Sequence, residues 1–370
     1  MRVLVVNPGS STLKLVVLAD DGQMVAEEDV PSPDGAAETS VLEAFLDRVP
    51  ACDAAGVRFV HGGTRFRRSV LADDDVIAGL DDCAPLAPLH NPPALTALRV
   101  LRRRTAMPVV ACFDTAFFAG LPAPAATYAV PRPWTEEWGI RRFGFHGLSH
   151  SWASRRAAEL LGGTEAGLRL VTCHLGAGAS LAAVAGGAPL DTTMGFTPLD
   201  GLVMATRCGA LDPGILLWVE RHHGLTPDDI ERVLDRESGL LGVSGRSGDL
   251  RVVLEAADGG DEAARLAVAV YLHRLRGSVA AMVVALGGLD ALVFTGGVGE
   301  HSAPIRADCC AGLGFLGLAV NPDANAAGDG TGADRDITAP GNGPRVLVLR
   351  AREDLEIVRE VGAVLAPVGQ

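Results

Sequence analysis

Near its start the chain reads Val3-Leu4-Val5-Val6-Asn7-Pro8-Gly9-Ser10-Ser11-Thr12-Leu13-Lys14-Leu15-Val16-Val17-Leu18. Two apolar runs flank a turn of small residues, which predicts a strand, a turn and a returning strand. The turn is rich in hydroxyls and backbone N–H groups, which can hold a phosphate. Lys14 is the only lysine in a chain that otherwise uses arginine, which indicates a site that needs a compact ammonium. A surface hairpin with a chance lysine is the alternative.

The opening pattern returns in the middle of the chain. An apolar run at 170–173 is followed by His174-Leu175-Gly176-Ala177-Gly178-Ala179-Ser180. A second apolar run at 181–185 and a Gly186-Gly187 turn then lead to a third predicted strand. A repeat this long is not a solenoid, so it predicts two related domains that face each other.

Composition excludes several classes of protein. With 370 residues, 48% hydrophobic and 21% charged, the chain is expected to be a soluble globular protein of two or three domains. No apolar run reaches the roughly 18 residues of a membrane span. The chain starts directly in a strand, without a signal pattern, which favours the cytoplasm. The net charge of −13 argues against broad nucleic-acid or anionic-membrane binding. Seven cysteines without C-x-x-C spacing are expected to be reduced and mostly buried.

Periodicity and helix-capping signals predict the other elements. Further strands are expected at 23–30, 57–60, 108–113, 291–294 and 346–349, and helices at 39–49, 93–104, 148–161, 262–286 and 354–365. The stretch 122–133 is predicted to connect two domains, and 320–343 to be a polar surface excursion. Asp114 follows the strand at 108–113, at the end of a strand where ligands sit in open α/β sheets.

Three glycine-bearing turns, around Gly9, Gly176 and Gly296, each follow an apolar strand. Together they indicate a nucleotide whose phosphates are held from both sides of a cleft. A dinucleotide-binding G-x-G-x-x-G turn would open a helix, whereas the first two turns lead into strands and the third lacks its last glycine. A Walker A loop is absent as well. The pattern therefore favours a two-lobed phosphotransferase.

Two further segments carry candidate cationic groups. In Ile140-Arg141-Arg142-Phe143-Gly144-Phe145-His146-Gly147-Leu148-Ser149-His150, His146 is a candidate hydrogen-bond donor to an anion. Zinc binding by His146 and His150 is the alternative, but no carboxylate is close in sequence. The loop at 191–214 is dense in turn formers yet not of low complexity, which is typical of functional loops. Arg207 within it is a candidate phosphoryl ligand, or a structural residue paired with Asp200 or Asp212.

Taken together, these motifs resemble the acetate kinase family, part of the superfamily of acetate and sugar kinases, heat-shock ATPases and actin. The resemblance covers nearly the whole chain. It rests on Asn7-Pro8-Gly9-Ser10-Ser11-Thr12-Leu13-Lys14, Arg58-Phe59-Val60-His61-Gly62-Gly63, Leu86-Ala87-Pro88-Leu89-His90-Asn91-Pro92, Phe113-Asp114-Thr115-Ala116-Phe117, Phe143-Gly144-Phe145-His146-Gly147, His174-Leu175-Gly176, Met194-Gly195-Phe196-Thr197-Pro198-Leu199-Asp200-Gly201, Thr206-Arg207-Cys208-Gly209, Phe294-Thr295-Gly296-Gly297-Val298-Gly299-Glu300 and Arg352-Glu353-Asp354-Leu355.

The resemblance implies an α/β fold of two duplicated actin-like (ribonuclease H-like) domains with the active site in the cleft between them. Residues 1–118 with a returning helix at 356–370 would form the first domain, and 119–355 the second, nucleotide-binding domain. The implied reaction is reversible transfer of a phosphoryl group from ATP to acetate, giving acetyl phosphate and ADP, with Mg²⁺ or Mn²⁺. A homodimer is implied as well.

The resemblance also implies roles for individual residues. Asn7 and Glu353 would serve the metal, and Arg58 would grip the substrate carboxylate. His146 and Arg207 would stabilise the transferring phosphoryl group, and Asp114 is the family's essential acidic residue. The acyl pocket would be walled by Val60, Leu89, Phe145 and Pro198. The nucleotide would be held by Lys14, Ser10, Ser11, Thr12, His174, Leu175, Gly176, Ala177, Gly178, Asp249, Leu250, Arg251, Gly297, Val298, Gly299, Glu300 and His301.

Physical chemistry agrees with these roles, because phosphoryl transfer depends on in-line positioning and on cations at the equatorial oxygens. A carboxylate nucleophile is already ionised near neutral pH, so Asp114 is expected to orient Arg58 or His146 rather than to remove a proton. The chain departs from the family at Ala177 and His301, where asparagine is usual, which bears on the phosphoryl donor. The alternatives are a kinase for propionate or butyrate, a changed donor, and a scaffold that binds nucleotide without catalysis.

Overall fold

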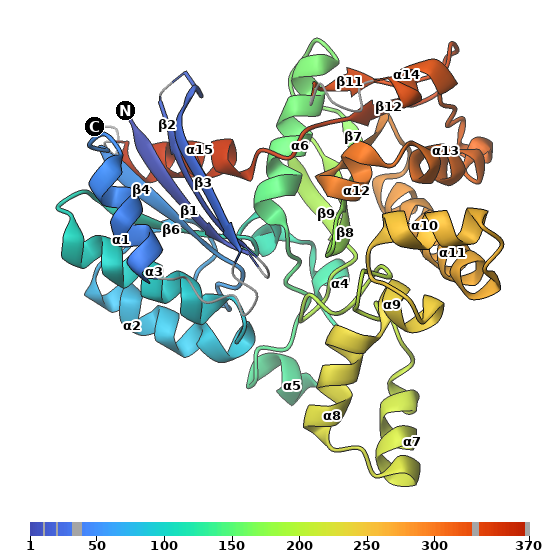
Figure 1. Cartoon of the computed structure of the whole chain (residues 1–370), viewed down its shortest axis with the longest axis horizontal. Helices are drawn as coiled ribbons and strands as arrows, with labels where there is room; N and C mark the ends of the chain where they lie inside the picture. The colour runs from blue at the N-terminus through green and yellow to red at the C-terminus, as the bar shows by residue number, and fades with distance from the viewer. Residues whose placement is uncertain (10–11, 20, 32–38, 328–332, 367–370) are drawn as a thin grey trace. The chain divides into compact units, whose positions relative to one another are not determined.

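The structure, a computed structural model, describes residues 1–9, 12–19, 21–31, 39–327 and 333–366. The chain divides into two compact units, whose elements are labelled in Figure 1. Unit 1 contains Met1–Gly120, Phe145–Trp152 and Arg352–Gln370, and unit 2 contains Leu121–Gly144 and Ala153–Ala351. Ser10 and Ser11 of the predicted phosphate turn lie outside the described residues, as do residues 32–38 between the predicted strand at 23–30 and the predicted helix at 39–49.

Unit 1 is built on a sheet with the strand order β3-β2-β1-β4-β6-β5. Its strands are β1 (Val3–Pro8), β2 (Thr12–Leu18), β3 (Met24–Pro31), β4 (Ala54–Phe59), β5 (Val70–Leu71) and β6 (Val109–Phe113). The hairpin β1–β2 and the pair β2–β3 are antiparallel, whereas β1, β4 and β6 run parallel. The helical segments are α1 (Thr39–Arg48), α2 (Asp74–Cys83), η1 (Ala84–Leu86), α3 (Asn91–Arg104), η2 (Phe117–Gly120) and α15 (Glu353–Leu365).

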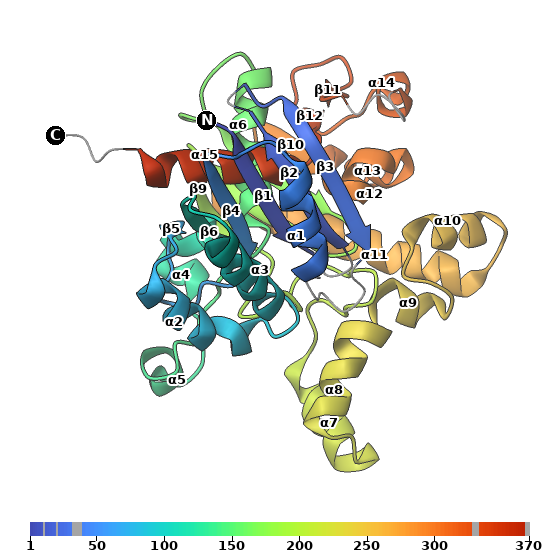
Figure 2. The same ribbon diagram turned by 60° about the vertical axis from the view of Figure 1, so that its left-hand side comes forward.

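Alternation along β1 explains how the sheet of unit 1 is covered on both faces. Leu4 and Val6 pack into a core with residues of α1, α2 and α3, whereas Val3 and Val5 pack on the other face with Ile357 and Val361 of α15. Figure 2 shows α1 and α3 lying over one face of this sheet. The approach of α15 is close, since a Cβ atom on Gly56 of β4 would lie 2.4 Å from Ile357. The last helix of the chain therefore completes the core of the unit that contains the first strand.

Unit 2 has a second sheet, with the strand order β11-β12-β10-β7-β8-β9. Its strands are β7 (Arg169–Leu175), β8 (Ala179–Ala185), β9 (Ala188–Thr192), β10 (Ala291–Thr295), β11 (Arg335–Asp336) and β12 (Arg345–Val348). Its helical segments are α4 (Ala123–Ala126), α5 (Arg132–Glu136), α7 (Pro213–His223), α8 (Pro227–Arg232), η3 (Val233–Glu237), α9 (Gly239–Ser244), α10 (Leu250–Asp258), α11 (Glu262–Leu286), α12 (Gly296–His301), α13 (Ala303–Ala311), η4 (Gly314–Leu316) and α14 (Pro322–Ala326). The boundary between the units falls within α6 (Gly147–Leu160).

The two sheets have the same topology, as the opening and central sequence patterns predicted. In each unit an antiparallel meander of three strands is followed by two parallel strands, β4 and β6 in unit 1 and β10 and β12 in unit 2. In each unit a two-residue strand, β5 or β11, pairs antiparallel with the last parallel strand. The predicted duplicated α/β fold is therefore confirmed.

One local prediction was wrong, and another was confirmed only in part. The stretch after Thr295 was read as a glycine turn, but it forms the short helix α12. Gly296 has φ +77°, which lets the chain leave β10, and the helix follows directly. The excursion at 320–343 is not only a surface loop, because it contains α14 and β11, and Ile337 is fully buried. Its buried Asn325 accepts a hydrogen bond at 2.8 Å from Arg306, a buried residue on α13. This contact holds part of the polar segment in the interior of unit 2.

The helix α11 is long and apolar enough to cross a membrane by length and composition alone. In this structure it contacts α9, α10, α13 and the strands β7, β8 and β9 of unit 2. Several of its apolar side chains, such as Leu275 and Val279, are buried against these neighbours. Part of its apolar surface is therefore buried within unit 2, whereas Leu266 and Val284 are exposed.

We expect few of the seven cysteines to react with a thiol reagent while the protein is folded. All seven are free, and only Cys52 and Cys208 are more than marginally exposed. Burial raises the pKa of Cys112 and of Cys310 to about 12, and the thiolate is the reactive form. Titration with a chromogenic disulfide at pH 8 should modify at most two thiols in native protein and seven in denaturant. Rapid native modification of four or more would contradict this burial.

Candidate active site

Unit 1 brings together four side chains at the carboxyl ends of its parallel strands. Arg58 on β4 donates from Nε and Nη2 to Oδ2 of Asp114, at 3.0 and 2.6 Å. Its Nη1 donates to Oδ1 of Asn7 at 2.9 Å, and Nδ2 of Asn7 donates to Oε2 of Glu353 at 3.1 Å. Asn7 comes from β1, Asp114 follows β6 and Glu353 begins α15. Residues far apart in sequence thus form one connected polar group.

The group is largely buried. The side chains of Arg58, Asp114 and Glu353 are 12%, 1% and 16% exposed. Burial raises the pKa of Asp114, and Glu353 adds to this effect while Arg58 opposes it. Burial also lowers the pKa of Arg58, but the two carboxylates outweigh it and hold that pKa above its usual value. Oδ1 of Asp114 is buried and has no hydrogen-bond partner of good geometry among the described residues, although the backbone N–H of Leu148 is close enough to lower the pKa of Asp114.

The backbone around Asp114 is fixed from both sides. Its N–H donates to the carbonyl of Phe59 at 3.0 Å, and its carbonyl accepts from Gly147 at 3.1 Å. His146, which directly precedes Gly147, is the only non-glycine residue with positive φ (55°) in the described part of the chain. Strained backbone of this kind persists where the surroundings enforce it, often at functional sites. His146 is half-buried, whereas His150, the other candidate zinc ligand, is fully buried against Phe118.

The predicted acyl-pocket residues are placed as follows. Val60 and Phe145 are buried in unit 1, and Phe145 makes an edge contact with His61 at a centroid distance of 5.4 Å. Leu89, also in unit 1, is 41% exposed. Pro198 belongs to unit 2 and is partly buried.

The predicted nucleotide residues of unit 2 come together near the end of β7. His174 pairs with Thr295 of β10, so α12 starts beside the turn that contains Ala177. The carbonyl of Ala177 accepts from Ala205 at 3.1 Å, and Ala205 approaches Gly248 so closely that a Cβ atom there would lie 2.9 Å from its carbonyl oxygen. Gly248 directly precedes the predicted stretch 249–251, so the three stretches of unit 2 form one neighbourhood.

Two predicted nucleotide residues have their polar groups engaged within unit 2. Oε1 of Glu300 accepts from the backbone N–H groups of Gly296 and Ala351 at 3.1 and 2.9 Å, so it fixes the start of α12. Asp249 caps α10 by accepting from the N–H of Arg251 at 2.9 Å, and hydrogen bonds from Arg251 lower its pKa.

In unit 1, Lys14 lies opposite Asn7 in the β1–β2 hairpin. Its Nζ lies 3.0 Å from Oε1 of Glu27, and both side chains are 37% exposed. An exposed pair of this kind contributes little to stability, so Lys14 can exchange this partner for an anion. Thr12 closes the turn, since its carbonyl accepts from Gly9 at 2.7 Å.

Arg207 lies in unit 2 and forms an ion pair with Asp235, which was not predicted from the sequence. Its Nε donates to Oδ1 of Asp235 at 2.8 Å, and the two side chains are 16% and 26% exposed. The alternative pairing with Asp200 or Asp212 was wrong. Asp200 pairs with Arg142, and Asp212 caps α7. No sequence signal links Arg207 to Asp235, which follows 28 residues later on η3.

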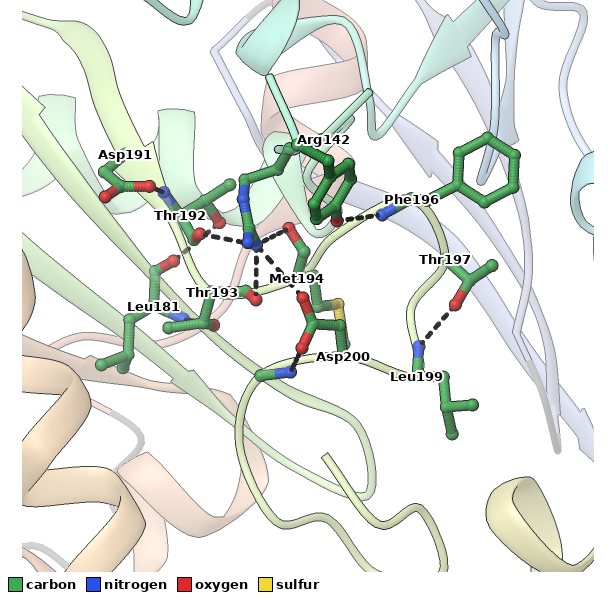
Figure 3. Close-up of polar contacts among 12 residues, drawn as sticks. Arg142, Leu181, Asp191, Thr192, Thr193, Met194, Phe196, Thr197, Leu199 and Asp200 are labelled. Atoms are coloured by element: carbon green, nitrogen blue, oxygen red, sulfur yellow. Dashed lines mark hydrogen bonds and ion pairs between the residues drawn. The ribbon is translucent and has the colours of Figure 1, made fainter. Parts of the chain in front are cut away.

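Figure 3 shows a second arginine, Arg142, whose guanidinium group faces Thr192, Thr193, Met194 and Asp200. Its Nη1 lies 3.2, 2.9 and 3.0 Å from the carbonyl oxygens of Thr192, Thr193 and Met194. It also lies 3.4 Å from Oδ2 of Asp200. Arg142 belongs to the cationic segment at 140–150, and no role was predicted for it. Its position directly before the Phe143-Gly144-Phe145-His146 motif was the only sequence feature that could have singled it out.

A cavity of about 190 Å³ lies in unit 1, lined by Phe113, Phe117 and Gly147 together with Arg67, Arg68, Glu356 and Arg359. Oε1 of Glu356 accepts hydrogen bonds from Ser151 and Arg359. None of the residues predicted to bind substrate or nucleotide lines this cavity, although Gly147, which donates to the carbonyl of Asp114, does.

We expect a Gly147→Ala substitution to destabilise the segment that carries Asp114. A Cβ atom at this position would lie 2.0 Å from the carbonyl oxygen of Asp114 and 2.8 Å from Cβ of Phe117. Overpacking of this kind costs about 1–3 kcal/mol, which thermal unfolding would detect as a lower Tm. Gly120→Ala is the matched control, because nothing lies within 4 Å of its added atom. Equal Tm values for the two variants would contradict the close approach.

Comparison with known proteins identifies relatives over almost the whole chain. The model of the Acetokinase family matches residues 34–359. The acetate kinase of Gloeobacter violaceus is 49% identical over 310 residues, which is 83% of this chain and 76% of that protein. The crystal structure of Porphyromonas gingivalis acetate kinase is similar with a TM-score of 0.89 and 35% identity, over 98% of this chain and 99% of that one. That of a propionate kinase from Francisella tularensis is similar with a TM-score of 0.88 and 34% identity, over 97% and 98%.

Proposed function

The chain belongs to the acetokinase family, and we propose that it transfers the γ-phosphoryl group of ATP reversibly to acetate, giving acetyl phosphate and ADP. The observation that carries this proposal is the connected group of Arg58, Asp114, Asn7 and Glu353 in unit 1. The guanidinium group of Arg58 is a buried cation that can bind a carboxylate. The oxygen atoms of Asp114, Asn7 and Glu353 lie beside it.

In the proposed reaction a carboxylate oxygen of acetate attacks the γ-phosphorus of ATP. An O–P bond forms while the bond from the γ-phosphorus to the bridging oxygen breaks, and ADP leaves with that oxygen. Arg58 would hold the acetate carboxylate, and its two hydrogen bonds to Asp114 would keep the guanidinium in place. His146 and Arg207 would stabilise negative charge on the phosphoryl oxygens. Acetate is already ionised, so no residue needs to remove a proton.

The residues around Arg58 also fit a divalent metal ion. Oδ1 of Asp114, the carboxylate of Glu353 and Oδ1 of Asn7 are hard oxygen donors of the kind that Mg²⁺ and Mn²⁺ prefer. Within the described residues no group of three or more His, Cys, Asp or Glu side chains could hold a metal. Mg²⁺ usually binds through one or two carboxylates, waters and substrate phosphates. We therefore propose that Asn7 and Glu353 hold Mg²⁺, which would neutralise charge on the phosphates.

Propionate is the second candidate acceptor, and the similarity to a propionate kinase structure favours it over longer acids. One methylene changes discrimination by only about 1–3 kcal/mol, so the acceptor has to be measured. A nucleotide-binding scaffold without catalysis would have little reason to keep Arg58, Asp114, His146 and Arg207 together in one sequence.

Trapping of acyl phosphates with hydroxylamine tests the proposal. Purified protein with Mg²⁺ is incubated with acetate, propionate or butyrate, each combined with ATP, GTP or pyrophosphate. We expect the highest kcat/KM for acetate with ATP. The three phosphoryl donors are compared because Ala177 and His301 lie in stretches proposed to hold the nucleotide. The absence of acyl phosphate from every combination would overturn the proposed function. We also propose that the protein is a homodimer, which light scattering would test.

A further inference from the structure

We propose that the cavity of unit 1 is a second binding site, for a small carboxylate or phosphate that carries an apolar group, and that a ligand bound there slows phosphoryl transfer by shifting Asp114. Arg67 and Arg68 would bind the oxygen atoms of this ligand. The effect on phosphoryl transfer rests on the proposed function, in which Arg58 holds acetate. The binding itself does not depend on that function.

The lining of the cavity carries an excess of positive charge. Three arginines, Arg67, Arg68 and Arg359, line it together with two glutamates, Glu356 and Glu360. Both glutamates form ion pairs with Arg359. Arg67 donates to a backbone carbonyl, and neither Arg67 nor Arg68 forms an ion pair among the described residues. Two guanidinium groups without a carboxylate partner therefore line this cavity, in a chain whose net charge is −13.

Another part of the lining is apolar and buried. Phe113 and Leu148 are 1% and 5% exposed, and Phe117 is partly buried beside them. Arg67 and Arg68, by contrast, are exposed. The cavity therefore combines a buried apolar wall with cationic side chains that are open to solvent.

The size and chemistry of the lining define the class of ligand. The cavity has a volume of about 190 Å³, and an engineered apolar cavity of about 150 Å³ is large enough to bind benzene. Guanidinium groups bind carboxylates and phosphates through paired N–H groups. The cavity thus fits an anion with a ring-sized apolar group against Phe113 and Phe117 and its oxygen atoms at Arg67 and Arg68. Acetate, whose apolar part is one methyl group, would leave most of this volume empty.

The apolar wall of the cavity is joined to the polar group around Asp114. Phe113 directly precedes Asp114 in the chain, and the N–H of Gly147 donates to the carbonyl of Asp114 at 3.1 Å. The N–H of Leu148 lies close enough to the Asp114 carboxyl to lower its pKa. A Cβ atom on Gly147 would lie 2.0 Å from the carbonyl oxygen of Asp114, so no free space separates this wall from Asp114. A ligand that moves Gly147 must therefore move Asp114 as well.

A shift of Asp114 would reach the proposed acetate ligand. Both hydrogen bonds from Arg58 to Asp114 end on Oδ2, so the guanidinium group follows this carboxylate. Phosphoryl transfer depends on the positions of the reacting groups, and a misplacement of about 1 Å can lower a rate about 100-fold. A ligand in the cavity should therefore lower kcat. Because it binds apart from acetate, a higher concentration of acetate should not restore the rate.

Titration calorimetry of the full chain tests the binding. Benzoate and phenylphosphonate share an apolar ring and differ in the oxyanion, and inorganic phosphate lacks the ring. We expect at least one of the two ring compounds to bind with a Kd in the millimolar range or below, and inorganic phosphate to bind at least about tenfold more weakly. Equal affinity for inorganic phosphate would overturn the role of the apolar wall.

Substitution of the arginines locates the site. Arg68→Gln should weaken binding of the ring compound at least about tenfold, because it removes a charged hydrogen-bond donor. Arg67→Gln should weaken it in the same direction. Arg103→Gln is the matched control and should bind as the wild type does. Arg103 is another exposed arginine of unit 1 that forms no ion pair among the described residues, and it does not line the cavity.

Rates of acetyl phosphate formation test the effect of the bound ligand. A saturating concentration of the ring compound should lower kcat at least about threefold, without relief by acetate. Failure of both ring compounds to bind, or unchanged binding in both Arg68→Gln and Arg67→Gln, would overturn the site. Binding without inhibition, or inhibition that acetate relieves, would overturn the link to Asp114. Wild-type protein that forms no acyl phosphate would instead overturn the proposed function, and calorimetry would still decide whether the cavity binds an anion.

Discussion

An Arg58→Met variant is expected to lose about 3–5 kcal/mol in its free energy of unfolding, because removing one partner of a buried ion pair leaves the other charge uncompensated. The stranded group is Asp114, whose side chain is 1% exposed and whose Oδ2 accepts both hydrogen bonds from Arg58. Urea unfolding followed by circular dichroism measures the loss. The variant should also form no detectable acetyl phosphate, since Arg58 is the proposed ligand of the acetate carboxylate.

A double-mutant cycle separates the two roles of Arg58. The Arg58→Met/Asp114→Leu double variant removes the buried Asp114 charge as well, and leaves only Glu353, 16% exposed, without the nearby Arg58 cation, so we expect it to recover part of the lost stability. It should remain inactive, because the proposed carboxylate ligand is still missing. Losses in stability that simply add would show that Arg58 and Asp114 do not interact as the structure indicates. For activity, an Asp114→Asn variant with a normal rate at neutral pH would rule out any essential role for the Asp114 charge.

Replacing Arg207 with Ala is expected to lower kcat by about 10²–10³-fold, the usual effect of removing one donor that stabilises charge in a transition state. The reason is its proposed contact with the transferring phosphoryl group. Stability should change little, since Arg207 makes one ion pair among the described residues and that pair is partly exposed. Initial rates of acetyl phosphate formation under saturating acetate and ATP give kcat, and thermal unfolding gives the stability.

The matched control for Arg207 is Asp235→Asn. It removes the charge of the only carboxylate within ion-pair distance of Arg207 among the described residues and leaves the guanidinium in place. If Arg207 acts on the phosphoryl group, Asp235→Asn should lower kcat far less than Arg207→Ala. If the two variants lose the same activity and the same stability, Arg207 serves only to hold η3 beside its loop.

The sequence predicts the frame of both units well, because alternation and apolar runs are local signals. The strands that contain Val3, Leu170 and Leu292 could be placed from such runs, and the shared strand order confirmed the predicted duplication. The residues at strand ends were predictable for the same reason. Asn7, Arg58 and Asp114 each lie at or near the end of a parallel strand, so the topology brings them to one edge of the sheet.

Contacts between distant segments were not predictable, because no local pattern records them. The pairing of Arg207 with Asp235 and the contacts of Arg142 with the carbonyl groups of residues 192–194 depend on loop paths that only the folded chain shows. The helix α12 was missed because three glycines in six residues disfavour a helix. Its start is held by Glu300, and its last carbonyl groups accept from the buried Arg306 at 2.9 Å. Tertiary contacts therefore override the local preference there.

The position of α15 in unit 1 has a consequence for synthesis of the protein on the ribosome. Ile357 and Val361 are fully buried against β1, β4 and β6, and Glu353 supplies the last member of the polar group around Arg58. All three are translated after the whole of unit 2. Domains usually fold in the order in which they emerge, but here the unit that emerges first must wait for a segment that follows unit 2. Unit 2 is therefore expected to reach its native state before unit 1, and a ribosome stalled before residue 353 should hold unit 1 in a protease-sensitive form.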